Sequence, residues 1–189
     1  MNSYYTKNEL ENIGFNSIGN NVLISKKSSI YSPEKMNIGS NVRIDDFAIL
    51  TGEINIGNYV HIASFTGLFG SAGIKMEDFT GVSSRVSIYS SSDDYSGSSL
   101  TNPMVPDKYK SINCGEVCLK KHSIVGASSV ILPGVVIGKG SSIGAMTLVT
   151  KSTKDWKIYF GIPAKPIKNR KKDLLRLEKE LKKEVIFDV

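Results

Sequence analysis

Aliphatic residues recur at every sixth position along most of this chain. Of the 18 positions in register, 17 are Ile, Leu or Val, although these three types make up only 47 of the 189 residues. A six-residue period fits neither an amphipathic helix nor a simple alternating strand. It predicts short strands joined by sharp corners, with one aliphatic side chain per strand pointing inward. The positions in register are Ile18, Ile24, Ile30, Ile38, Ile44, Leu50, Ile56, Ile62, Leu68, Ile74, Thr80, Val86, Leu119, Val125, Ile131, Ile137, Ile143 and Val149.

Several repeats carry a glycine directly after the aliphatic residue, as in Ile38-Gly39 and Ile137-Gly138. Glycine suits a corner where the backbone turns sharply. Three such strands make one 18-residue coil of a triangular prism, and stacked coils lie about 4.8 Å apart, as neighbouring strands do. The pattern therefore predicts an all-β solenoid whose core is a ladder of inward aliphatic side chains.

The repeats divide the chain into three regions. Residues 1–16 precede them and contain Thr6-Lys7-Asn8-Glu9, a capping box that predicts a short helix. Residues 17–152 form the predicted β-helix, interrupted over 90–116 by a loop rich in Ser, Asp, Gly and Pro. Residues 153–189 contain an extended exit strand and a basic helix over 170–183, with Leu174, Leu177 and Leu181 on one face.

Composition narrows the class of protein. Hydrophobic residues make up 40% and charged residues 22%, which excludes a disordered chain. The net charge is +6, but residues 151–183 hold 12 Lys/Arg and 4 Asp/Glu, so the basic charge is concentrated at the C-terminal end. This distribution predicts a local site for an anion. With no basic-then-apolar stretch at the N-terminus and only Cys114 and Cys118, we expect a cytoplasmic protein without disulfides.

On these repeats, the chain resembles the hexapeptide-repeat acyltransferases, whose fold is a left-handed parallel β-helix. The segment Gly161-Ile162-Pro163-Ala164-Lys165 also resembles the exit found in the sugar acetyltransferases of this family. The resemblance implies an acetyl-CoA-dependent enzyme that works as a homotrimer, with active sites between subunits. The loop and exit segments look most like the branch that acts in surface-polysaccharide synthesis.

Acyl transfer from a thioester requires a group that takes the proton of the attacking hydroxyl or amine, and histidine is the usual choice. The chain has two histidines. His61 precedes the inward Ile62, so its side chain is expected to point outward, and we take it as a candidate catalytic base. His122 follows two lysines at a corner and is expected to be a solvent-facing structural residue.

The loop departs from the family pattern. Related galactoside and maltose O-acetyltransferases carry their catalytic histidine in the loop, whereas this loop reads Ser91-Ser92-Asp93-Asp94-Tyr95. Two hypotheses follow. His61 is the base and Asp93 or Asp94 orients it, or one of these two carboxylates takes the proton itself. The alternative without a catalytic role is that Asp93 and Asp94 only shape a turn.

The donor site follows from the same resemblance. Segments that match the family's acetyl-CoA groove supply small residues beside the pantetheine arm and lysines for the phosphates. The residues assigned to the donor in this way are Gly126, Ala127, Ala145, Thr150, Lys151, Lys165 and Lys168, with Arg170 as a further candidate.

We therefore expect an acetyl-CoA-dependent transferase that acetylates a sugar hydroxyl, or alternatively the amine of a nucleotide-linked amino sugar. Longer acyl donors stay open. A γ-class carbonic anhydrase is disfavoured because its zinc site needs three histidines, and no other metal site is expected. A purely structural β-helix lacks the exit segment, and the basic tail lacks the aromatic residues typical of nucleic-acid binding. Neither nucleic acid nor membrane insertion is expected.

Overall fold

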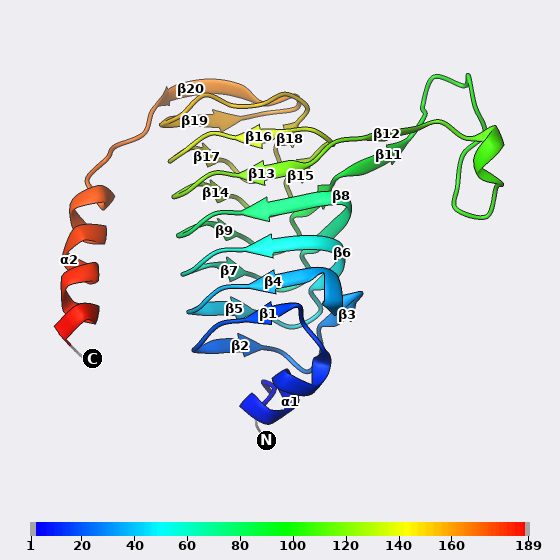
Figure 1. The fold of residues 1–189 in the computed structure, drawn as a ribbon. Coiled ribbons are helices and arrows are strands. Elements are labelled where there is room, and N and C mark those ends of the chain that lie inside the picture. Colours follow the sequence, from blue (N-terminus) through cyan, green and yellow to red (C-terminus); the bar gives the residue numbers. More distant parts are fainter. Residues whose placement is uncertain (1–2, 188–189) are drawn as a thin grey trace.

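The computed structural model describes residues 3–187, the last three of them by backbone alone. The chain winds into a three-sided prism of stacked parallel strands, with a two-stranded arm on one side and a C-terminal helix on the other (Figure 1). Most paired strands are 18 to 20 residues apart, as in the pairs Ile44 with Ile62 and Val22 with Val42, and strands on either side of the interruption are 43 apart, as in Ile88 with Ile131. The predicted parallel β-helix is confirmed.

Each face of the prism is one ladder of parallel strands. The first face consists of β1 (Ser17–Ile18), β4 (Met36–Ile38), the second halves of β6 (Ile49–Ile56) and β8 (Gly67–Met76), β13 (Val117–Leu119) and β16 (Val136–Ile137). The second consists of β2 (Val22–Ile24), β5 (Val42–Ile44), β7 (His61–Ile62), β9 (Gly81–Val82), β14 (Ile124–Val125), β17 (Ser142–Ile143) and β19 (Lys157–Phe160). The third consists of β3 (Ser29–Tyr31), the first halves of β6 and β8, β10 (Ser87–Tyr89), β15 (Val130–Ile131) and β18 (Leu148–Val149).

The corners are turned by residues in the left-handed region of the backbone. The first corner joins the first and second faces, and the second corner joins the second and third. Most of these residues are not glycine, and many are aromatic, which is unusual because a bulky side chain rarely adopts positive φ. Stacking between coils offsets this strain. The residues concerned are Asn21, Asn41, Tyr59, Phe79, His122, Gly140 and Trp156 at the first corner, and Phe47, Phe65, Arg85, Ser128 and Met146 at the second.

The register differs from the predicted one over 74–86. On the faces, Ile56 pairs with Met76 and Ile62 with Val82, so the inward face positions are Met76 and Val82 rather than Ile74 and Thr80. The count failed because β8 contains extra residues around Gly70, where it bends between faces. Each six-residue unit has two inward positions, two residues apart, so the slip leaves the apolar pattern intact. Thr80 occupies the first of these positions and Val82 the second, and both are buried.

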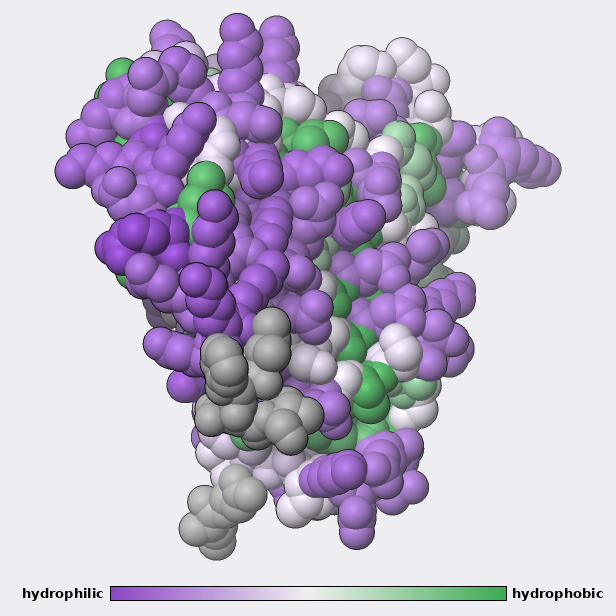
Figure 2. Space-filling view, turned by 60° about the vertical axis from the view of Figure 1, so that its left-hand side comes forward, coloured by the Kyte–Doolittle hydropathy of each residue, from purple (hydrophilic) through white to green (hydrophobic). Residues whose placement is uncertain are grey.

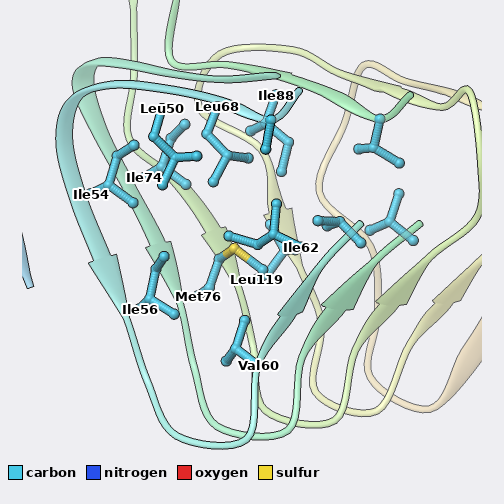
Figure 3. Close-up of a cluster of buried hydrophobic side chains, with 14 of the residues drawn as sticks. Leu50, Ile54, Ile56, Val60, Ile62, Leu68, Ile74, Met76, Ile88 and Leu119 are labelled. Atoms are coloured by element: carbon cyan, nitrogen blue, oxygen red, sulfur yellow. The ribbon is translucent and has the colours of Figure 1, made fainter. Parts of the chain in front are cut away.

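The interior of the prism is filled by these aliphatic side chains (Figure 3). The largest, such as Leu50, Ile62 and Leu119, are completely buried. Burial of one such side chain contributes roughly 1.5–3 kcal/mol, so the ladder is the main source of stability. The rigid core fixes the positions of the outward side chains at the corners.

The first and last coils of the prism adjoin different elements. The helix α1 (Lys7–Ile13) begins at Thr6 with the predicted capping box, and its Leu10 is buried against the first coil. At the other end the exit is a hairpin rather than a single strand. Strand β19 pairs antiparallel with β20 (Lys165–Asn169), because Gly161, at φ 106°, reverses the chain.

The helix α2 (Leu174–Phe187) runs beside the coils, back toward the N-terminal end of the prism (Figure 1). The face of the molecule that carries α2 is mostly hydrophilic, with hydrophobic residues in a narrow band along the coils (Figure 2). No helix within residues 3–187 is long and apolar enough to cross a membrane.

The interruption over 90–116 leaves the third corner as an arm. It consists of β11 (Ser91–Asp93), antiparallel to β12 (Ile112–Cys114), with the short 3-10 helix η2 (Asp107–Tyr109) near its tip. A second 3-10 turn, η1 (Pro33–Lys35), inserts between β3 and β4, where the step between the in-register residues Ile30 and Ile38 is eight residues instead of six.

Candidate active site

His61 is held by a carboxylate from the coil below it. Its Nε2 lies 2.7 Å from Oδ2 of Asp45, and Nε of Arg43 donates to Oδ1 of the same carboxylate at 2.6 Å. Burial alone would raise the pKa of Asp45, but the hydrogen bonds from His61 and Arg43 outweigh it and hold that pKa below its usual value. The ionised Asp45 therefore orients the exposed imidazole, as expected for a histidine that moves protons.

The structure does not bring His61 to Asp93 or Asp94. His61 lies on the second face, whereas Asp93 ends β11 on the arm that leaves the third corner. The hypothesis that a loop aspartate orients His61 is thus not met within one chain, where Asp45 does so. Sequence reasoning missed Asp45, although it directly follows Ile44, which pairs with Ile62. One coil counted back from His61 leads to Arg43, and Asp45 lies two residues further along that coil.

A cleft of about 1290 Å³ lies between the arm and the third face. It brings together three of the predicted site residues, Asp93, Asp94 and Thr150. Tyr89 and Leu148 line it from the coils, and Lys110 lines it from the arm. The cleft thus combines two carboxylates and one lysine with a lining that is part polar and part apolar.

The two aspartates differ in their surroundings. The carboxylate of Asp94 accepts hydrogen bonds from the backbone N–H groups of Ser96, Ser98 and Ser99 and from the Ser99 hydroxyl. These bonds, those from Ser96 foremost, lower the pKa of Asp94 to about 2, so it stays ionised and is a poor proton acceptor.

Asp93 is less engaged. Within residues 3–187, the Asp93 carboxylate accepts one hydrogen bond, a long contact of 3.4 Å from the N–H of Asn102 to Oδ2. Asp94 therefore shapes the turn, as the alternative without a catalytic role expects. Most of the Asp93 carboxylate is free to face the cleft.

The residues assigned to the donor lie in two places. Gly126, Ala127 and Ala145 follow one another up the second corner, where a Cβ on Gly126 would lie 2.5 Å from the backbone N of Ala145. Lys165 lies just above them, because the turn after Phe160 tops the same corner and Phe160 covers Gly144. Thr150, with Lys151 next to it, follows β18 and lies toward the third corner.

The candidate lysines are available to a ligand. Lys151, Lys165 and Lys168 are exposed, and none forms an ion pair with a carboxylate of the described part of the chain. Arg170 is different. It donates to the carbonyl oxygens of His122 at 2.7 Å and Gly140 at 3.1 Å, so it fastens the chain to the first corner. The expectation that Arg170 contacts phosphate is therefore not supported.

His122 is buried, not solvent-facing as expected. Its ring stacks on Phe79, with centroids 5.3 Å apart, and its Nε2 donates to Glu178 of α2 at 2.8 Å. Burial lowers the pKa of His122 more than the hydrogen bond to Glu178 raises it. The burial of His122 could not be predicted from its local sequence, because the covering element, α2, lies more than fifty residues further along the chain.

A groove of about 520 Å³ separates α2 from the second face and includes His61 at its edge. The predicted apolar stripe of α2, Leu174, Leu177 and Leu181, lines it. Within the described residues, no group of three or more His, Cys, Asp or Glu side chains is arranged to hold a metal ion.

Comparison with known proteins places this fold and site in a class of enzymes. No family model matches the chain. It is 42% identical to a dTDP-4-amino-4,6-dideoxy-D-glucose acyltransferase from Escherichia coli, over 98% of each protein. It is 27% identical to the putative lipopolysaccharide biosynthesis O-acetyl transferase WbbJ of Escherichia coli K12, over 77% of this chain and 74% of that protein.

Among solved structures, AntD, an N-acyltransferase from Bacillus cereus in complex with dTDP and 3-hydroxybutyryl-CoA, is 52% identical and covers 98% of this chain and 99% of its own, with a TM-score of 0.96. The chain belongs to the hexapeptide-repeat acyltransferases with a left-handed β-helix. It is an acyltransferase, and it is more similar to the acyltransferase named for a dTDP-linked amino sugar and to the N-acyltransferase bound to dTDP than to the O-acetyl transferase WbbJ.

Proposed function

We propose that this enzyme transfers an acyl group from a coenzyme A thioester to the amino group of a dTDP-linked amino sugar. The observation that carries the proposal is the similarity, along nearly the whole chain, to the Escherichia coli acyltransferase and to AntD. N-acylation, the alternative drawn from the sequence, thus replaces O-acetylation as the better-supported function. The donor is acetyl-CoA or a short 3-hydroxyacyl-CoA, the kind of donor present in the AntD complex.

The cleft chemistry fits an amine. The amine nitrogen attacks the thioester carbonyl carbon, the C–S bond breaks, and coenzyme A leaves as its thiol after taking up the proton released by nitrogen. An amine needs less help from a base than a hydroxyl does, which agrees with a loop that carries no histidine. In this proposal the ionised Asp94 holds the ammonium form electrostatically, and the freer Asp93 accepts its proton.

His61 stays a candidate base, oriented by Asp45. It and the cleft lie on different faces of one chain, so both serve one site only if two copies meet. We therefore also propose a homotrimer in which the arm of one subunit reaches the second corner of its neighbour. The exposed apolar residues of the arm, such as Met104 at 90% and Tyr95 at 93% exposure, support this, because large apolar side chains are seldom left in water at such a density.

The donor runs along the second corner in this proposal. The small side chains of Ala127, which is half-buried, and Ala145, which is exposed, leave room for the pantetheine arm, and Gly126 allows the close approach of the next coil. The phosphates lie at the C-terminal end of the prism, near Lys165, Lys168 and Lys151, with Thr150 on the cleft side. The same proposal divides the chain into an N-terminal cap before residue 17, a β-helix domain over 17–152 and a C-terminal segment after 152. It also places the reaction in the cytoplasm.

The test is release of coenzyme A thiol from acetyl-CoA and from 3-hydroxybutyryl-CoA, with dTDP-4-amino-4,6-dideoxyglucose as acceptor. Wild type is compared with Asp93→Asn, Asp94→Asn and His61→Asn. We expect turnover with this acceptor, a loss of about a hundredfold or more for the residue that takes the proton, and a smaller loss for the others. Turnover only with sugars that lack an amine would refute the proposal.

A further inference from the structure

Strands β19 and β20 form a hairpin at the C-terminal end of the prism (Figure 1). In the described part of the chain, β20 is the last strand in the ladder of the second face. The turn of the hairpin rests on the coil below it. The N–H of Leu148 donates to the carbonyl oxygen of Gly161 at 3.1 Å, and the N–H of Ala164 donates to that of Leu148 at 2.8 Å. Side chains on the hairpin are therefore held in place at this end of the molecule.

Large apolar side chains are exposed on this hairpin and on the coil beneath it. Ile162, in the turn, is 74% exposed, and Ile167, on β20, is 61% exposed. Phe160, on β19, is 48% exposed, and Met146, two residues before Leu148, is 70% exposed. We call Met146, Phe160, Ile162 and Ile167 the end patch. Apolar side chains gathered on one exposed surface indicate a site that meets another molecule or a membrane.

The charge around the end patch has one sign. Residues 156–172, which include the hairpin, contain six Lys or Arg and no Asp or Glu. Lys154, Lys165 and Lys168 are exposed, and none forms an ion pair with a carboxylate of a described residue. Asp155, which precedes this stretch, accepts a backbone N–H of the preceding coil at 2.8 Å. The end patch thus lies among cations that other parts of the chain do not neutralise.

Donor binding accounts for only part of this surface. The proposed function uses Lys165 and Lys168 for the phosphates of coenzyme A, but it uses neither the exposed isoleucines nor Lys154. Neither the cleft beside the arm nor the groove under α2 includes the four side chains of the end patch. The end patch is therefore an open apolar surface among cations and not the wall of either pocket.

We propose that the end patch docks this enzyme on an anionic lipid surface, a property separate from the proposed reaction. Ile162 and Ile167 enter the boundary between headgroups and acyl chains, where burial of apolar surface favours binding. The lysines around them, Lys154 among them, bind the lipid phosphates, and each cation near an anionic surface adds to the affinity. A lipid surface suits this end of the prism because it needs no pocket and offers both an apolar layer and negative charge.

The test is co-sedimentation of the protein with vesicles of phosphatidylcholine alone and with vesicles that also contain phosphatidylglycerol. Ile162→Asn and Ile167→Asn are combined in one variant, which removes the exposed aliphatic side chains and keeps the charge. Lys154→Gln removes one cation and keeps the end patch. The two variants thus probe the apolar and the electrostatic part of the contact separately.

The matched controls lie toward the other end of the prism. Leu23→Asn is combined with Tyr31→Asn, because these residues are 42% and 59% exposed on β2 and β3. Lys35→Gln removes an exposed lysine of η1. Urea unfolding and the sedimentation coefficient without vesicles are measured for every variant, which separates lipid binding from folding and assembly.

We expect wild type to bind the vesicles that contain phosphatidylglycerol, and to bind them more weakly at high salt because the cations are then screened. The double isoleucine variant should bind about tenfold or more weakly, and Lys154→Gln about fivefold more weakly, with both controls within about twofold of wild type. The urea midpoint and the sedimentation coefficient stay unchanged.

Failure of wild type to bind either kind of vesicle overturns the proposal, and so does equal binding by wild type and the isoleucine variant. A changed sedimentation coefficient of the isoleucine variant without vesicles also overturns it, since the end patch is then a subunit contact. If that variant unfolds at a lower urea concentration than wild type, Lys154→Gln decides, because it leaves the end patch intact. Unchanged binding in Lys154→Gln then overturns the proposal, and weaker binding supports it.

Discussion

Glu178 is the residue that fastens α2 to the prism, and its replacement by glutamine tests this account of the C-terminal helix. Its carboxylate accepts hydrogen bonds from Lys121 at 2.5 Å, His122 at 2.8 Å and, within α2, Lys182 at 2.7 Å. The side chain is only 11% exposed. Glu180, two residues on, is a matched control, because it is 50% exposed and, among the residues that the structure describes, its ion pair is with Arg176, one turn earlier in α2.

The contacts of Glu178 determine how much free energy the docking of α2 loses when this residue is replaced. A hydrogen bond to a charged group contributes about 1.5–3 kcal/mol net, and glutamine keeps the size but loses the charge that two lysines share. We expect Glu178→Gln to cost about 2–3 kcal/mol in the docking of α2. An exposed pair at this spacing in a helix contributes about 0.3–0.5 kcal/mol, so Glu180→Gln costs less than that.

Hydrogen exchange of the amides in α2, read beside urea unfolding of the whole protein, measures this cost. We expect exchange in α2 to speed up by about thirtyfold or more in Glu178→Gln and by less than about threefold in Glu180→Gln, by the conversion of about 1.4 kcal/mol per factor of ten. Equal rates in the two variants would show that α2 docks through its leucines, and the account would be wrong.

The same carboxylate gives the docking a pH dependence. Contacts with Lys121, Lys182 and His122 overcome the effect of burial and lower the pKa of Glu178 from 4.5 to about 2. A group with a lowered pKa in the folded state stabilises it fully above its unfolded pKa. The difference between wild type and Glu178→Gln should therefore be constant above about pH 5 and shrink as the pH falls from 4.5 toward 2. A difference that grows on acidification would contradict this assignment.

Three further variants probe the site and the core. Asp94→Asn should lower kcat by about tenfold, less than Asp93→Asn, through loss of the fixed negative charge, while Asp107→Asn, at 98% exposure on the same arm, should leave kcat unchanged, as measured by thiol release. Gly126→Ala should raise KM for acyl-CoA and cost about 1–3 kcal/mol, since the new Cβ meets the next coil, whereas Gly81→Ala has its nearest atom at 3.9 Å and should be nearly neutral. Leu119→Ala should cost about 3 kcal/mol in urea unfolding, against under about 0.5 kcal/mol for the 58% exposed Leu100→Ala.

The β-helix could be predicted from the sequence because the residues that fill its interior recur at a fixed spacing. One inward aliphatic residue is needed per strand, so Ile44, Ile62 and Val125 mark the faces directly in the sequence. The register around Thr80 was not predictable, because the two extra residues near Gly70 shift one inward position onto the other. The apolar pattern is unchanged by that shift, and only strand pairing reveals it.

The candidate site was predictable only in part. Small residues and lysines along one corner follow from the repeat, and so does the outward direction of His61. Contacts between distant segments do not. Asp45 meets His61 across one coil, and α2 buries His122 from the far end of the chain. The loop aspartates were recognised as a pair, but their different roles depend on backbone N–H groups that only the folded arm directs at Asp94.

The most direct test of the central claim compares dTDP-4-amino-4,6-dideoxyglucose with its counterpart that bears a hydroxyl in place of the amine. Both are offered with the same acyl-CoA, kcat/KM is measured for each, and the product is identified by mass spectrometry and by the stability of an amide in mild alkali. The account predicts an N-acylated nucleotide sugar and a preference for the amine of about a thousandfold or more, since an amine attacks with less help from a base than a hydroxyl does and the loop carries no histidine. Equal rates, or an alkali-labile ester as the main product, would contradict it.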